Sequence, residues 1–114
     1  MAGTRVVLVS VRGVVGDVVR DALYERDVDV VADLHDEARL DAMLARVAVD
    51  CVVWSTDDGD APAAALLAHH PRLTIIALEH EGRRVFLHRM CPRRVPLGEL
   101  SPTSLADVVE AAGR

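Results

Sequence analysis

The chain has 114 residues, about half of them apolar, and a formal net charge of −5. This length fits one domain over residues 1–114 and is too short for two. No apolar run approaches the ~18 residues of a membrane span and the start lacks a secretion signal, so we expect a cytoplasmic protein with no membrane partner. An acidic chain is also a poor general binder of nucleic acid, and we do not expect that partner.

Strand-like and helix-like stretches alternate along the first part of the chain. Thr4 to Ser10 is almost entirely apolar and predicts a strand, and residues 14 to about 26 repeat apolar side chains at helical spacing. Val28 to Ala32 predicts a second strand, followed by a polar stretch. Asp36 is then expected to cap a second helix, whose apolar positions recur every three or four residues up to Val47.

The stretch from Val49 to Asp58 holds a short apolar run that ends in a polar, acidic segment. Such a run is typical of a strand buried on both faces, so we expect the central strand of a parallel sheet here. A third helix is expected from Ala61-Pro62, and a fourth strand over Leu73 to Leu78. The alternation predicts an α/β fold with helices on both faces of the sheet.

The pattern changes after the fourth strand. Residues 84–90 alternate in a way that favours a β-hairpin with residues 73–79, turning at Glu81-Gly82. A distorted short helix at 83–90 is the alternative. Residues 97–100 are expected to form a short edge strand or a loop. Ser101 and Pro102 then provide the N-cap and first residue of a C-terminal helix.

The order of strands and helices, the length and the ending SPTSLADVVEAA resemble the receiver domain of response regulators. The resemblance implies a three-layer, flavodoxin-like parallel sheet of β-α repeats, with the hairpin in place of the fourth receiver helix. It also implies a place in bacterial signalling. The chain departs from the family at its working positions, which hold Ser10 for the acidic pair, Ser55 for the phosphoacceptor, Glu79 for the hydroxyl residue and Gly98 for the lysine.

These departures bear on the activity. Phosphoryl transfer to a carboxylate needs the acceptor, a metal ion and a cation together, and the chain contains no lysine at all. We therefore expect no aspartyl phosphorylation, no catalytic residue and no cofactor. What the resemblance then implies is a non-catalytic protein-interaction module in a signalling or regulatory assembly.

Carboxylates and histidines also collect where the predicted strands end. Asp57, Asp58, Glu79 and His80 are ligand types that suit a divalent cation. The alternative function is accordingly a small metal- or ligand-binding enzyme that uses this acidic cluster. No ligand spacing supports it, however, and solvated loops are also rich in carboxylates, so we expect no bound metal.

The last part of the chain has the opposite charge balance from the rest. Residues 83–114 carry six arginines against three acidic residues. Because arginine is favoured at protein interfaces, we expect a protein partner, a second copy of the chain, or both. A solvated hairpin whose arginines offset the acidic body is the alternative. The residues expected to contact the partner are Arg83, Arg84, Phe86, His88, Arg89, Arg93 and Arg94.

Overall fold

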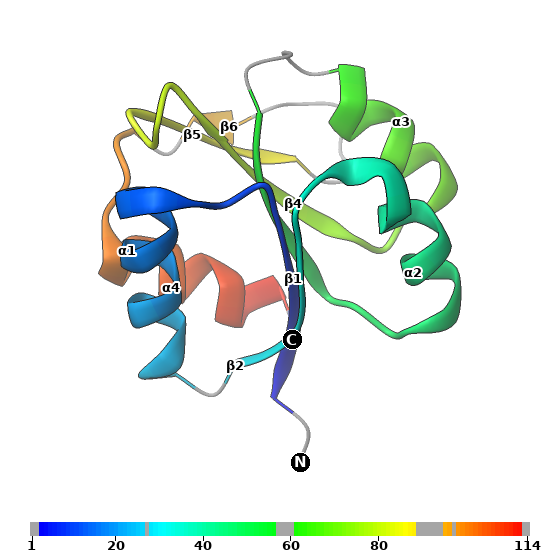
Figure 1. The fold of residues 1–114 in the computed structure, drawn as a ribbon, viewed down its shortest axis with the longest axis horizontal. Helices are drawn as coiled ribbons and strands as arrows, with labels where there is room; N and C mark the ends of the chain where they lie inside the picture. Colours follow the sequence, from blue (N-terminus) through cyan, green and yellow to red (C-terminus); the bar gives the residue numbers. More distant parts are fainter. Residues whose placement is uncertain (1–2, 27, 57–60, 89–94, 97, 113–114) are drawn as a thin grey trace.

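Strands and helices alternate along the chain, as the hydrophobic pattern predicts (Figure 1). The computed structural model describes residues 3–26, 28–56, 61–88, 95–96 and 98–112. A 3-10 turn over Glu37–Arg39 leads directly into the second α-helix. The elements are β1 (Thr4–Val9), α1 (Gly13–Tyr24), β2 (Val28–Leu34), α2 (Leu40–Arg46), β3 (Cys51–Ser55), α3 (Ala61–His69), β4 (Thr74–Glu79), β5 (Arg84–His88), β6 (Val95–Pro96) and α4 (Pro102–Ala112).

All the described strands form one sheet, in the order β2-β1-β3-β4-β5-β6. β1 pairs in parallel with β2 and β3, and β3 pairs in parallel with β4. β5 is antiparallel to both of its neighbours. The expectation that the third strand lies inside the sheet is confirmed, because β3 is flanked by β1 and β4.

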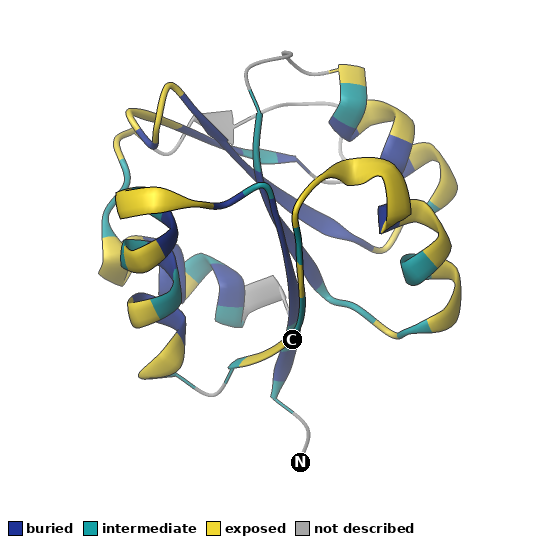
Figure 2. Cartoon of the chain, in the orientation of Figure 1, coloured by how far each residue is buried: buried dark blue, intermediate teal, exposed yellow. Residues whose placement is uncertain are grey.

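Two hydrophobic clusters lie on opposite faces of this sheet, since successive strand residues point to opposite sides. Cys51 and Val53 join the cluster under α1 and α4, whereas Val52 and Trp54 join the cluster under α2 and α3. Figure 2 shows the buried strands between helices whose outer faces are exposed. The predicted α/β architecture with helices on both faces is therefore confirmed.

The predicted hairpin is confirmed, and the alternative of a short helix at 83–90 is wrong. β4 and β5 are antiparallel, with Glu79 opposite Arg84. The turn between them holds three consecutive residues with positive φ, namely His80, Glu81 and Gly82 (51°, 57° and 87°). In a strand, successive side chains of residues 84–88 point to opposite faces of the sheet, which matches the alternating pattern of this segment. A helix would not separate these side chains into two such faces.

The end of β2 differs from the prediction, and of the two alternatives for residues 97–100 the described residues 98–100 form a loop. β2 continues through Leu34, and the amide of Ser10 donates to the Leu34 carbonyl at 2.9 Å. The last short strand lies at Val95–Pro96, and residues 98–100 lie outside any strand. Gly98 and Leu100 still pair with the hairpin, because Val85 N donates to Gly98 O and Leu100 N donates to Gly82 O. Leu97 is outside the described residues.

Both predicted caps make a side-chain hydrogen bond, although Asp36 caps the 3-10 turn before α2 and not α2 itself. The Asp36 carboxylate accepts from Ala38 N at 2.9 Å, and the Ser101 hydroxyl oxygen accepts from Ser104 N at 3.4 Å. Within the described part of the chain, no helix has the length and apolar character needed to cross a membrane.

An ion-pair group joins the end of α1 to α4. The Arg26 guanidinium donates to Asp107 at 2.8 Å and to Glu110 at 3.0 Å. These hydrogen bonds, to Asp107 first and Glu110 second, raise the pKa of Arg26 above its ordinary value. The two helices that share one face of the sheet are thus held together at the surface as well as through their apolar sides.

Candidate functional site

The carboxyl ends of the four parallel strands meet at one edge of the sheet, where doubly wound proteins bind ligands. Ser10 follows β1, His35 follows β2, Ser55 ends β3 and Glu79 ends β4. We refer to these four residues and their immediate neighbours as the carboxyl rim. The sequence singled out Ser10, Ser55 and Glu79, and the structure brings their strand ends together with that of β2.

The position after β1 is occupied by internal contacts. Ser10 has a φ of 56°, and its hydroxyl donates to the His35 carbonyl at 3.0 Å. The next residue, Val11, is fully buried and packs in the core cluster under α1 and α4. Neither residue offers a carboxylate at this position.

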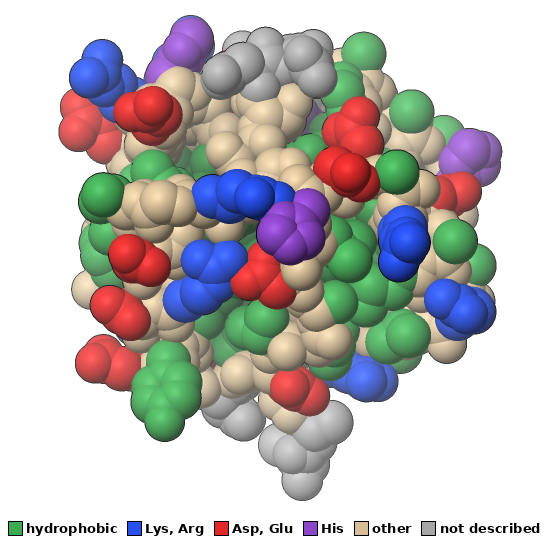
Figure 3. Space-filling view, in the orientation of Figure 1, with side chains coloured by type: hydrophobic (Ala, Val, Ile, Leu, Met, Phe, Trp, Pro, Cys, Tyr) green, Lys and Arg blue, Asp and Glu red, His purple; other side chains and the backbone are tan. Residues whose placement is uncertain are grey.

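Two arginines close the rim between β1 and β2. The Arg12 guanidinium contacts Nδ1 and the carbonyl of His35. Arg20 donates through Nε to Asp33 at 2.9 Å and through Nη2 to the Val11 carbonyl at 2.9 Å. Figure 3 shows basic, acidic and histidine side chains gathered near the middle of one face. Both arginines of the rim therefore pair with neighbouring groups of the same chain.

The end of β3 carries no acidic residue among the described positions. Ser55 is half-buried, and the amide of the following Thr56 donates to the Leu78 carbonyl at 3.0 Å. Asp50 lies at the opposite end of the strand, where its carboxylate accepts from Arg5 N at 2.9 Å. Asp50 therefore lies at the edge of the sheet opposite the carboxyl rim.

The predicted acidic cluster is only partly within the described chain. Glu79 is buried, with 7% of its surface exposed, whereas His80 is exposed in the hairpin turn. Asp57 and Asp58 lie outside the described residues. Among the residues that the structure describes, no group of three His, Cys, Asp or Glu side chains is placed to hold a metal ion.

The interaction residues predicted on the hairpin divide by burial. Arg83 and Arg84 are exposed, while Phe86 and His88 are buried in the sheet. The Arg84 guanidinium lies 5.2 Å from the centre of the Phe86 ring, which is a cation–π distance. The remaining three arginines of the prediction, Arg89, Arg93 and Arg94, fall outside the described residues.

Sequence reasoning missed the partners of the rim arginines. Arg20 lies 13 residues from Asp33 and Arg12 lies 23 residues from His35, so only the parallel pairing of β1 and β2 brings them together. It also missed the tight fit at Gly16, where an added Cβ would lie 2.9 Å from the Val11 carbonyl oxygen and 2.5 Å from Nη1 of Arg20. The spacing of Gly13 and Gly16 is visible in the sequence, but the spacing does not show which residues pack against Gly16.

Comparison with protein-family models, with curated proteins and with solved structures found no match to this chain.

Proposed function

We propose that this chain is a receiver-like protein-interaction module of a signalling or regulatory assembly, and that it is not phosphorylated on aspartate. The strand order β2-β1-β3-β4-β5 with helices on both faces supports a flavodoxin-like assignment, because that order defines the flavodoxin-like doubly wound fold. The antiparallel β5 is the main departure, since it follows a hairpin where that fold has a helix.

One observation carries the proposal: the central strand of the sheet ends in Ser55. A receiver needs a carboxylate there, a metal site after the first strand and a lysine near the last helix. Here the position after β1 holds Ser10 and the buried Val11, Gly98 stands near the lysine position, and the chain has no lysine. A fold that keeps its framework without these groups is suited to binding through its surface.

The exposed arginines of the hairpin support a docking role. Arg83 and Arg84 lie together at the start of β5, and the Phe86 ring supports the Arg84 guanidinium. A guanidinium held against a ring loses less freedom on binding and pairs well with carboxylates. The partner that this surface fits is a protein with an acidic patch.

Phosphotransfer is tested directly with a small phosphodonor. The purified chain is incubated with acetyl phosphate and Mg²⁺, and its intact mass is followed. We expect no change of mass. The same sample is melted with Mg²⁺, Mn²⁺ and Zn²⁺, and we expect no shift of Tm. A gain of one phosphoryl group would contradict the proposal, and a saturable Tm shift would favour the metal- or ligand-binding enzyme instead.

Docking is tested by charge reversal. Partners that copurify with the chain are identified and purified, and their affinity is measured for the wild type and for R83E/R84E. The matched control is R39E/R46E, which reverses two exposed arginines near and on α2. We expect R83E/R84E to weaken binding about tenfold or more, and the control to change it less than about twofold. Equal affinities for the two variants would count against this surface. Sedimentation of the chain alone reports whether the partner is a second copy.

A further inference from the structure

Two small cavities lie beside the hairpin, each of about 180 Å³. The arginine cavity is lined by residues 83–86 at the start of β5 and by residues 98–99. The helix cavity lies between β5, residues 99–101 and α4. Val85 and Glu99 line both cavities, so the two adjoin and form one groove.

The arginine cavity provides donors for an anionic group. The Arg84 guanidinium lies 5.2 Å from the centre of the Phe86 ring, which restricts its movement. Within the described chain, Arg20 and Arg26 form ion pairs with carboxylates, whereas Arg83 and Arg84 form none. A guanidinium can donate two parallel hydrogen bonds to one carboxylate. These two arginines are therefore suited to a carboxylate that comes from another molecule.

The helix cavity is mainly apolar. Val85 and Leu105 are buried, and Leu100 and Val108 are half-buried against the same core cluster. Its volume is below the roughly 300–1,000 Å³ that is usual for small-molecule sites. The cavity therefore suits a single apolar side chain better than a whole small molecule.

Glu99 is the acidic side chain in the lining of this groove, and it is exposed. The two lining arginines exceed it by one positive charge, in a protein whose net charge is −5. Because like charges repel, Glu99 opposes a carboxylate that lies next to it. The groove thus favours a segment with a carboxylate at the arginines and an uncharged, apolar side chain beyond Glu99.

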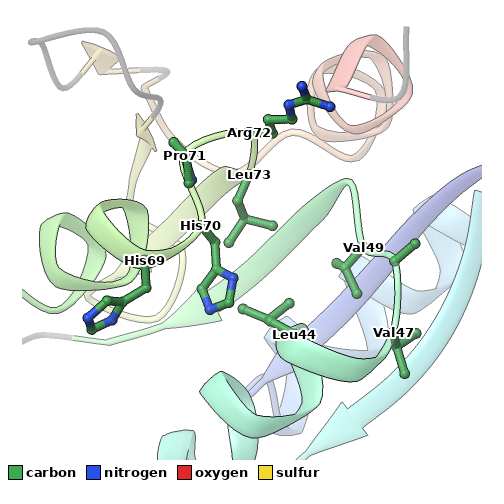
Figure 4. A pocket seen from close by; sticks show the side chains of 9 residues that line it. Leu44, Val47, Val49, His69, His70, Pro71, Arg72 and Leu73 are labelled. Atoms are coloured by element: carbon green, nitrogen blue, oxygen red, sulfur yellow. The ribbon is translucent and has the colours of Figure 1, made fainter.

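The larger cavity of the molecule lacks such donors. It has a volume of about 390 Å³ and lies between the ends of α2 and α3 (Figure 4). Nε2 of His70 in its lining is 2.7 Å from a carboxylate oxygen of Asp41, and the Arg72 side chain extends away from the apolar residues. The groove beside the hairpin is therefore the better candidate for recognising an acidic group.

We propose that this groove binds a short segment of the partner protein in which a carboxylate side chain stands close to an apolar one. The carboxylate pairs with Arg84, and the apolar side chain fills the helix cavity against Leu105 and Val108. The inference rests on the proposed docking function, because it takes the hairpin arginines as the contact, and it specifies what the partner presents to them.

The test uses three peptides with blocked ends, titrated into the whole chain while the backbone amide signals are followed by NMR. Glu-Leu-Glu-Leu-Glu combines both features, Gln-Leu-Gln-Leu-Gln lacks the charge, and Glu-Ser-Glu-Ser-Glu lacks the apolar side chains. We expect saturable binding of the first peptide that moves the signals of Val85 and Leu105. Each of the other two should bind about tenfold more weakly, because one loses the charge-assisted hydrogen bonds and the other the buried side chain.

Variants of the chain locate the charge effect. R84Q should weaken binding of Glu-Leu-Glu-Leu-Glu about fivefold or more, and E99Q should tighten it about twofold, because a like charge is removed. The matched control is R39Q, which removes an exposed arginine beside α2 and should change the affinity less than about twofold.

The inference is overturned by the absence of saturable binding, by equal binding of either comparison peptide, or by an unchanged affinity of R84Q. Such a result leaves the docking function intact as long as R83E/R84E still weakens binding of the whole partner. Equal affinities of the whole partner for R83E/R84E and its control would instead remove the docking function, so the two failures are distinguished.

Discussion

Gly82 in the hairpin turn is the position where a small substitution tests the fold most sharply. Its φ is 87°, a region that side chains other than glycine rarely adopt. An added Cβ would also lie 3.2 Å from Cδ2 and 3.3 Å from Cβ of Leu100, which packs against the core under α1 and α4. Gly82→Ala therefore introduces two costs, one in the backbone and one in packing.

Gly98 separates these two costs. Its φ is 80°, and a Cβ added there would meet nothing within 4 Å. We expect Gly98→Ala to lower the free energy of unfolding by about 1–2 kcal/mol, from the backbone alone. Gly82→Ala adds an overpacking cost and should lower it by about 2–4 kcal/mol in total. At about 4 °C per kcal/mol for a chain of this size, the second variant should lose roughly 8–16 °C of Tm.

Trp54 provides the assay, since it is the only tryptophan and is 5% exposed. Its fluorescence is followed during urea unfolding of the wild type and both variants, with the slope m expected to stay constant. Equal losses for the two variants would show that Leu100 does not press on the turn. If neither variant is destabilised, the assignment of positive φ to Gly82 and Gly98 is wrong.

Three further predictions concern other parts of the structure. Gly16→Ala should destabilise by about 1–3 kcal/mol in urea unfolding, although alanine normally improves a helix, because its Cβ would press on the Val11 carbonyl; a stabilised variant would contradict this packing. The pKa of Arg26 is raised in the folded state, first by its hydrogen bond to Asp107. The stability that Arg26 gives the folded state is therefore complete below the pKa of the unfolded state, and it is lost only as pH rises through the folded pKa in strongly alkaline solution. The difference in unfolding free energy between wild type and Arg26→Gln should therefore stay constant from about pH 6 to 10, and a difference that changes within this range would refute it. Ser55→Asp should gain no phosphoryl group from acetyl phosphate by intact mass, because an acceptor alone lacks the metal site and the cation; a labelled variant would show that these groups are not required.

Local sequence patterns were enough for the elements and for several of their ends. The run around Val53 is apolar on both faces, so burial in the middle of a sheet follows from the hydrophobic effect alone. Ser101 and Pro102 mark the start of α4, because the serine hydroxyl caps the first turn and the proline ring fixes a helical φ. Both effects act on neighbouring residues and can therefore be recognised in the sequence. The hairpin was predictable for the same reason, since alternation and the turn at Gly82 are local features.

The contacts between charged side chains of distant segments required the tertiary structure. Arg12 meets His35, Arg26 meets Asp107, and His70 meets Asp41 only after the sheet has brought distant segments together. Periodicity shows which face of an element is buried, but it does not show which surface residue of another element lies opposite. The sequence alone therefore determined the succession of strands and helices and the residue types at the strand ends, whereas the partners of the charged side chains were decided by long-range packing.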